Sequence, residues 1–253
     1  MNQYEAIAYR RSVRKFENTP MTETLMRNVT RFLQGLSPWN ETCRWKMEIV
    51  DSIAKECPIK GVGVVQAPYY LVFYGEKSPE ARQNAGYMME QMVLYLTTKG
   101  LGSCYQGGAR MKKEKIQDSL KALLILAFGY PVKCLLRDGA AAKRYPLKEL
   151  CIFKEEVGEE EKAILYAARL APSACNTQPW RFVVYQGKIH VFIRKNSLME
   201  HLLPAMKDIH IGIVLCHMQL AAEEQWLSPT FSVEEKVKER NIKKWDYVTT
   251  LAF

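Results

Sequence analysis

The same order of apolar segments occurs twice along this chain of 253 residues, and this repeat restricts the folds that the chain can adopt. Each copy has a helix that ends near a Ser-Pro or Pro-Ser pair, then two strand-like runs, then a long helix with an apolar stripe. The segment SPWNETCRWKMEIV (37–50) parallels PSACNTQPWRFVV (172–184). A repeat of this length exceeds a solenoid unit of roughly 20–50 residues, so the sequence predicts one duplicated domain.

The first copy contains three helical and three strand-like segments. Thr22 is the predicted N-cap of the second helix, and Gly100 with Gly102 stops the third. The continuous apolar run YYLVFY after Pro68 favours a strand that is buried on both faces. The spacing of apolar residues predicts helices over 3–9, 23–36 and 81–99 and strands over 45–50, 69–74 and 123–131.

The second copy begins with the segment EEVGEEEKAILYAARLA, whose glutamates favour the positive end of a helix dipole. That helix breaks at Pro172. Two strands around the Gln186-Gly187 turn then form a β-hairpin, a helix follows over 208–224, and YVTTLAF predicts a last strand.

The join between the copies, at about 150–158, is short and acidic and contains no Gly/Ser-rich or Pro-rich linker. The copies are therefore expected to pack as one body, with a first half over 1–155 and a second half over 156–253. The predicted fold class is α+β, with a mixed sheet core that is flanked by helices and built from two related halves.

Composition excludes several classes of protein. Hydrophobic residues make up 48% of the chain, but no apolar run reaches the roughly 18 residues that a membrane span needs. The first residues lack the apolar core of a signal peptide, so a cytoplasmic protein is expected. Seven scattered cysteines without a C-x-x-C pair argue against disulfides and zinc, and four histidines without an H-E-x-x-H pair indicate no metal. These residues are Cys43, Cys57, Cys104, Cys134, Cys151, Cys175, Cys216, His190, His201, His210 and His217.

The formal net charge of +9 has two readings, a nucleic-acid surface or an attraction for phosphorylated small molecules. The basic residues are spread along the chain, and no RRM, zinc-finger or helix-turn-helix signature is present. The basic stretch KVKERNIKK near the C-terminus is typical of a solvated segment. The sequence therefore favours a small-molecule ligand and no nucleic acid.

The segment RRSVR places Arg10, Arg11, Ser12 and Arg14 between two predicted helices. Arginine donates two parallel hydrogen bonds to phosphate oxygens, and serine adds a neutral donor, so this set suits an anion. An ordinary solvated arginine-rich stretch is the alternative.

The segment APSACNTQPWRFVV places Pro172, Ser173, Asn176 and Gln178 on a loop between a helix and the hairpin. Serine and amide side chains offer both donors and acceptors, which suits the polar edge of a flavin ring. The alternative is a loop that ends the helix and covers the core with Pro179 and Trp180.

Together these segments resemble the FMN-dependent nitroreductase family, whose members open with R-x-S-x-R and carry P-S-x-x-N-x-Q-P-W. The segment NAGYMMEQMVLYLTTKGLGSCYQGG (84–108) is similar to the central helix and glycine-rich turn of that family. LAFGYP and AKRYPLKEL (142–150) resemble its C-terminal signature. The resemblance covers most of the chain.

The order of the two motifs departs from the ordinary family pattern, in which they lie close together in one chain. Ordinary members are homodimers that clasp FMN at their interface. Here the first half keeps R-x-S-x-R and the second keeps PSACNTQ. The resemblance therefore implies the tandem branch of the family, a monomer that acts as a pseudo-dimer with one complete site, with further self-association left open.

The resemblance also implies the residues that bind FMN. Arg10, Ser12 and Arg14 would contact the phosphate and the pyrimidine side, Arg14 with its charge near the N1 edge, and Arg11 is close enough to reach an anion. The remaining expected contacts are Lys143 and Arg144 at the phosphate, Gln106 and Gly107 beside the ring, and Pro172, Ser173, Asn176 and Gln178 from the opposite half. Ala174 stands where a second serine is common.

The activity implied is ping-pong transfer of reducing equivalents from NAD(P)H to a nitroaromatic, a quinone or a similar small acceptor. The cofactor carries this chemistry, so no catalytic side chain is expected, and Cys175 has no evident histidine partner. Flavin-dependent dehalogenation, flavin fragmentation, a flavin-sensing module without turnover and a basic nucleic-acid-binding protein remain open. Stacking of a nicotinamide on a flavin leaves no Rossmann fingerprint that would distinguish NADH from NADPH.

Overall fold

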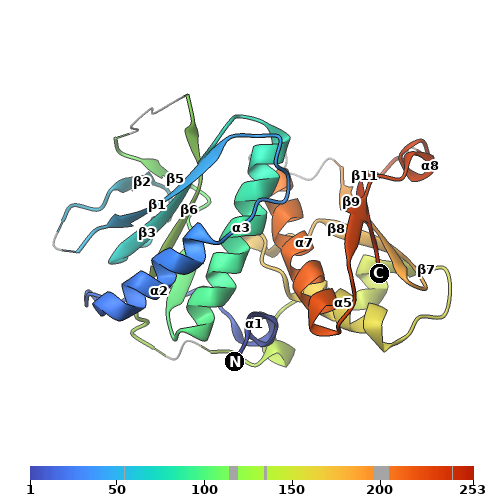
Figure 1. Ribbon diagram of the computed structural model, residues 1–253, viewed down its shortest axis with the longest axis horizontal. Coiled ribbons are helices and arrows are strands. Elements are labelled where there is room, and N and C mark those ends of the chain that lie inside the picture. The colour runs from blue at the N-terminus through green and yellow to red at the C-terminus, as the bar shows by residue number, and fades with distance from the viewer. Residues whose placement is uncertain (54, 114–118, 134–135, 196–204, 241) are drawn as a thin grey trace.

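The computed structural model describes residues 1–53, 55–113, 119–133, 136–195, 205–240 and 242–253. Two long helices, α3 (Pro79–Thr98) and α7 (Met206–Glu224), lie side by side at the centre, with one sheet on each flank (Figure 1). None of the helices in the described ranges is long and apolar enough to cross a membrane. Cys134 and His201, included in the cysteine and histidine patterns above, lie outside the described residues.

The first sheet is antiparallel and has the strand order β1-β3-β6-β4. Its strands are β1 (Trp45–Asp51), β3 (Tyr69–Gly75), β6 (Lys121–Gly129) and β4 (Gly102–Tyr105). The buried strand predicted for YYLVFY is confirmed, since all of β3 except Tyr74 is buried. The helix α2 (Glu23–Gln34) begins at its predicted cap, because the Thr22 hydroxyl accepts a hydrogen bond from the Leu25 amide. A small ribbon of β2 (Ile59–Gly61) and β5 (Ala109–Met111) lies beside this sheet.

The second sheet has the order β10-β11-β9-β8-β7 and is mixed, because β7 runs parallel to β8. The predicted hairpin is confirmed as β8 (Trp180–Tyr185) and β9 (Lys188–Arg194), and the predicted last strand as β11 (Trp245–Ala252). The other two strands are β7 (Cys151–Phe153) and β10 (Thr230–Ser232). The remaining helical segments are α1 (Gln3–Tyr9), η1 (Gly139–Ala141), α4 (Leu147–Leu150), α5 (Glu159–Leu170), η2 (Ala174–Asn176) and α8 (Glu235–Lys238).

The two sheets share one internal order. The chain forms α2, β1, β3, α3, β4 and β6 in the first half, and α5, β8, β9, α7, β10 and β11 in the second. The corresponding spatial orders, β1-β3-β6-β4 and β8-β9-β11-β10, are the same. The strand β7, which lies within the acidic join, pairs with β8 at the edge of the second sheet.

The α3–α7 contact is reciprocal. A Cβ atom on Gly86 would overlap with the carbonyl oxygen of Ile209, and one on Gly212 would overlap with that of Gln83. Gln83 and Ile209 each precede the glycine of their own helix by three residues. In a two-fold interface residue i contacts j and j contacts i, so these helices pack about an approximate two-fold axis.

An ion pair lies across the same axis. Arg82 Nε and Asp208 Oδ2 are 2.7 Å apart, and each residue precedes its helix's glycine by four positions. This pair joins equivalent positions of the two helices. The large core that contains α3 and α7 also includes apolar side chains from both sheets, so the halves share one interior.

Candidate functional site

A cleft of about 280 Å³ lies between the halves and takes its walls from both. Five of the residues predicted for the cofactor line it, namely Ser12, Arg14, Gly107, Pro172 and Ser173. The structure thus brings the R-x-S-x-R and P-S-x-x-N-x-Q segments together, although some 160 residues separate them. The further lining residues are Cys104, Tyr105, Gly108, Leu124, Ala174, Cys175, Met206, Ile209, His210 and Ile213.

The R-x-S-x-R segment reaches the cleft by running along β4. Ser12 forms a parallel bridge with Ser103, and the Val13 amide donates to the Ser103 carbonyl over 2.9 Å. A side chain at Gly102 would collide with Val13, so this glycine permits the close approach. The backbone pairing places Ser12 and Arg14 at the cleft.

Three buried or half-buried arginines form a cationic group beside the cleft. Arg10 is 4% exposed, and its Nε and Nη1 atoms have no hydrogen-bond partner among the described residues. Within the same described part of the chain, Nε and Nη2 of Arg137 and Nε of Arg144 are also buried without a partner. Burial and the charges of neighbouring arginines, Arg10 foremost, lower the pKa of Arg144 to about 10.

Buried unpaired donors are costly, and an anion would satisfy them. The donor set therefore fits a phosphate group, as expected for Arg10 and Arg144. Sequence reasoning missed Arg137, which belongs to no motif, and only its burial beside Arg10 reveals it. Burial and the charges of Arg10 and Arg11 lower the pKa of Arg137 as well.

The loop that carries Asn176 and Gln178 holds the arginine segment in place. Asn176 Oδ1 accepts from Arg144 Nη1 over 2.9 Å, and Asn176 Nδ2 donates to the Lys143 carbonyl over 2.9 Å. Gln178 Oε1 accepts from the Tyr145 amide over 2.8 Å. In the structure both amides thus bond to the 143–145 segment and neither lines the cleft, and their contact with a flavin edge stays a prediction.

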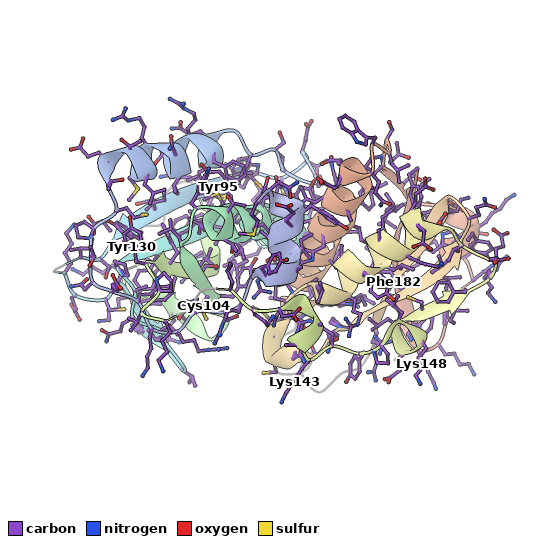
Figure 2. All side chains as sticks on the ribbon, turned by 90° about the horizontal axis from the view of Figure 1, so that it is seen from below. Tyr95, Cys104, Tyr130, Lys143, Lys148 and Phe182 are labelled. Carbon is purple, nitrogen blue, oxygen red and sulfur yellow. The ribbon has the colours of Figure 1, made fainter. Side chains whose placement is uncertain are left out.

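Three other predicted residues also lie away from the cleft. Gln106 is buried, with its amide oxygen accepting from the Val65 amide and its nitrogen donating to the Cys104 carbonyl. Of Gln106 and Gly107, only Gly107 lines the cleft, and the contact of Gln106 with the ring stays a prediction. Arg11 and Lys143 are exposed, and Figure 2 shows Lys143 at the lower edge of the molecule.

The wall that the second half contributes has an unusual backbone. Cys175, Asn176 and Gln178 have φ values of 49°, 56° and 44°, in a region that few residues other than glycine adopt. Ser173 Oγ accepts from the Gln178 amide over 2.9 Å and helps to hold this turn. Strained loops of this kind cluster at ligand sites, because the surrounding contacts must hold them in place.

The family model described as "Putative TM nitroreductase" matches residues 2–222. The chain belongs to this nitroreductase family. The chain is similar in structure to a putative nitroreductase from Thermotoga maritima MSB8, with 23% sequence identity and a TM-score of 0.66. The match covers all of this chain and 94% of the other. At that identity the likeness shows the fold alone, and it confirms the α+β class.

Shorter relatives match about half of the chain. The match to a nitroreductase family protein from Clostridium difficile 630 covers 62% of this chain and all of the other, at 17% identity and a TM-score of 0.47. An FMN-dependent nitroreductase from Clostridium difficile R20291 covers 57% of this chain with 97% of its own, at 13% identity and a TM-score of 0.42. Among curated proteins, none matches the chain.

In this member of the family, His210 of α7 also lines the cleft, although no sequence motif singled it out. Its Nε2 atom accepts a hydrogen bond from the Ala174 amide over 2.9 Å, so the proton of the neutral ring lies on Nδ1. Burial lowers the pKa of His210 to about 4. The imidazole is therefore neutral near pH 7 and holds the 172–178 loop.

A buried polar network joins the cleft to the helix pair. Tyr105 donates to Glu90 Oε2 over 2.7 Å, and His217 Nε2 lies 2.9 Å from Glu90 Oε1. Glu90 and His217 have fully buried side chains, and His217 Nδ1 lies 2.8 Å from the Ala167 carbonyl. Since a carbonyl only accepts, Nδ1 carries a proton, and His217 and Glu90 share a second one. Burial and the Glu90 carboxylate raise the pKa of Tyr105 well above its usual value.

Proposed function

We propose that this member of the nitroreductase family binds FMN between its halves and passes reducing equivalents from NAD(P)H to a small acceptor such as a nitroaromatic or a quinone. The observation that carries the proposal is the group of buried arginine nitrogens beside the cleft that have no partner among the described residues. Arg10 is two residues from Ser12, and Arg144 is bonded to Asn176, next to the lining residue Cys175. A phosphate between these arginines would leave an attached ring within reach of the cleft.

Arg10, Arg137 and Arg144 would hold the phosphate, because guanidinium groups bind phosphate oxygens through short charge-assisted hydrogen bonds. A dianion there would also offset the mutual repulsion that contributes to the lowered pKa of Arg144. Asn176 would keep the Arg144 guanidinium in position through the hydrogen bond that it accepts. Binding and orientation are thus divided between two halves of the chain.

The side chains around the cleft would serve the ring and its surroundings. Leu124, Ile209 and Ile213 present apolar surface that excludes water from the reacting face. Arg14 adds positive charge at the rim and would stabilise negative charge that develops on the bound group. FMN, when bound, supplies the redox chemistry itself, and the protein contributes orientation and electrostatics.

We also propose that the two halves arose by duplication and act as a pseudo-dimer with one FMN per chain, in the division 1–155 and 156–253. The equal strand orders and the reciprocal contacts of Gly86 and Gly212 support this. A flavin-sensing module without turnover would need the same site, so turnover separates it from an enzyme. A nucleic-acid-binding protein would need an accessible basic surface instead of buried arginines around a cleft.

The deciding experiment is to purify the protein, record its spectrum and titrate it with FMN. We expect a yellow protein that binds one FMN per chain and oxidises NADH or NADPH when menadione or a nitroaromatic is added. Two flavins per chain would contradict the pseudo-dimer. Absence of flavin binding would refute the proposed function, and binding without NAD(P)H oxidation would favour the sensing module.

A further inference from the structure

A second cleft, of about 450 Å³, lies where the approximate two-fold axis would carry the first. The first turns of α3 contribute Glu80 and Gln83 to it, as α7 contributes Met206 and Ile209 to the first cleft. Glu80 and Met206 each precede their helix's glycine by six residues. The other lining residues are Trp39, Asn40, Ile193, Lys207, Ile211, Phe231, Ser232, Val233, Asp246, Tyr247, Val248 and Thr249.

The charge of this second cleft differs from that of the first. Among the described residues that line it, Lys207 carries the sole positive charge, and Lys207 already pairs with Asp246. Asp246 also forms an ion pair with Lys195, whose Nζ atom lies 3.2 Å from Asp246 Oδ1. Glu80 adds a carboxylate that forms no ion pair within the described ranges. Asp246 therefore engages the sole cation among these lining residues, so a phosphate is disfavoured and a neutral or positively charged ligand is favoured.

The second cleft has an aromatic wall where the first has a thiol. In the parallel between 37–50 and 172–184, Trp39 takes the place of Cys175. The Trp39 ring meets Phe231 edge to face, with centroids 4.5 Å apart, and lies 5.6 Å from the ring of Tyr87. Ile193, Ile211 and Val248 also line this cleft. A planar ring would find aromatic and aliphatic surface there.

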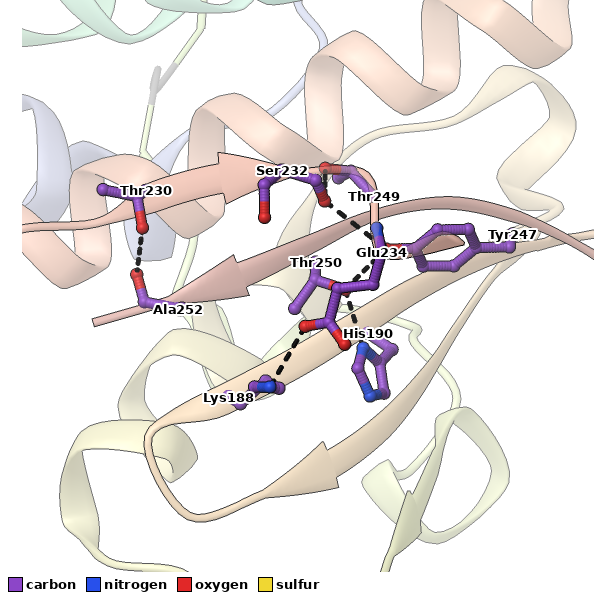
Figure 3. A network of polar contacts seen from close by, with 9 residues as sticks. All are labelled: Lys188, His190, Thr230, Ser232, Glu234, Tyr247, Thr249, Thr250 and Ala252. Carbon is purple, nitrogen blue, oxygen red and sulfur yellow. Dashed lines mark hydrogen bonds and ion pairs between the residues drawn. The ribbon is translucent and has the colours of Figure 1, made fainter. Parts of the chain in front are cut away.

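A polar network holds the opposite wall in shape (Figure 3). The hydroxyl of Thr249 donates to the Ser232 carbonyl over 3.0 Å, and that of Tyr247 accepts from the Glu234 amide over 3.0 Å. The hydroxyl of Thr250 lies 2.6 Å from the hydroxyl of Tyr247 and 2.7 Å from Nδ1 of the buried His190. These contacts tie β10 and the turn after it to β11, so the wall is built before any ligand arrives.

We propose that the second cleft binds a planar aromatic compound that lacks phosphate and is neutral or cationic. Its ring packs against Trp39 and Phe231, and its positive charge faces Glu80. The site is separate from the arginine group, so the compound and FMN bind the same chain together. The proposal holds whether or not FMN occupies the first cleft.

The test uses proflavine, a planar tricyclic cation, and riboflavin, a neutral one, in calorimetric titrations. Proflavine is titrated with and without saturating FMN, and riboflavin only with saturating FMN, so that the first cleft is occupied. We expect one proflavine site that FMN leaves unchanged. Trp39→Ala weakens both probes about tenfold, because it removes the aromatic ring against which they stack. Glu80→Gln weakens proflavine about threefold to fivefold and leaves riboflavin unchanged, as expected for a half-exposed charge.

Two further variants keep the test decisive. Val233→Lys changes an exposed rim residue, so it leaves the fold intact, and it should weaken proflavine while sparing riboflavin. Arg10→Ala with Arg144→Ala should lower FMN binding and leave the proflavine site unchanged. No binding of either probe at 1 mM, competition between proflavine and FMN, or proflavine binding by Trp39→Ala and Val233→Lys as tight as by the unaltered protein would each overturn the proposal. If the unaltered protein binds proflavine but not FMN, only the proposal for the first cleft is refuted.

Discussion

The two clefts occupy equivalent places about the α3–α7 contact, yet their side chains suit opposite ligands. The first lies beside Arg10, Arg137 and Arg144, whose buried nitrogens have no partner among the described residues. The second is lined by Trp39 and a lysine that is neutralised by an aspartate. The backbone order is the same on both sides. The difference in ligand that we propose would therefore be set by a few side chains on a shared frame.

A second contrast lies on the two central helices. His210 accepts a hydrogen bond from the Ala174 amide, and Asn84 accepts one from the Asn40 amide over 2.8 Å. Each acceptor precedes its helix's glycine by two residues and holds the loop that enters its cleft. Asparagine does not titrate, whereas histidine does, so of these two hydrogen bonds only the one to His210 depends on pH.

The largest expected effect concerns the arginine group, which the second cleft lacks. Arg10→Ala with Arg144→Ala should weaken FMN binding by about 3–6 kcal/mol, since each arginine–phosphate contact is worth about 1.5–3 kcal/mol. Fluorescence titration with FMN and with riboflavin measures it. Riboflavin lacks the phosphate, so its affinity should not change, and Lys143→Ala should be silent. An unchanged FMN affinity in the double variant would place the phosphate elsewhere.

The two-fold contact can be broken from either side. Gly86→Ala and Gly212→Ala each force a methyl group into a carbonyl of the facing helix, so each should lower the free energy of unfolding by about 3 kcal/mol. Denaturant unfolding would measure both. Gly35→Ala is the matched control, because its new methyl group meets only ordinary contacts. Unequal losses would weaken the equivalence of the two helices.

The buried His210 predicts that the stability of the fold decreases in acid. The folded-state pKa of His210, about 4, lies below the ordinary value of 6.5, so the unfolded chain binds the proton first as pH falls. This stability is complete above pH 6.5 and is lost toward pH 4, by on the order of 2–3 kcal/mol. Unfolding curves across that range measure it. His210→Asn, which copies Asn84, should flatten the dependence, and an unaltered slope would assign it to other groups.

The smallest effect tests the loop that positions Arg144. Asn176→Ala removes one hydrogen bond to the guanidinium and should weaken FMN binding by about 1 kcal/mol, or roughly fivefold. Riboflavin binding should change less, since the ring does not depend on Asn176. Thr177→Ala serves as the neighbouring control. A larger loss of affinity for riboflavin than for FMN would support the prediction from the sequence that Asn176 faces the ring.

Local patterns in the sequence predicted most of the secondary structure. Thr22 begins α2 as expected, and Gly100, with φ of 75°, follows the end of α3. Alternation and helical spacing depend on neighbours along the chain, which is why they could be read without the fold. The motifs also predicted the cleft residues Ser12, Arg14 and Ser173, because the family resemblance covers those segments.

Only the tertiary structure decided which polar atoms are free. In the sequence, Gln106 and Gln178 suit a ligand. In the structure, the backbone amides of Val65 and Tyr145, some 41 and 33 residues away, donate hydrogen bonds to their side-chain oxygens. Arg137 belongs to no motif and gains its role from burial beside Arg10. A side chain can bind a ligand only if its own fold leaves it unpaired, and partners that lie far away in the chain determine this.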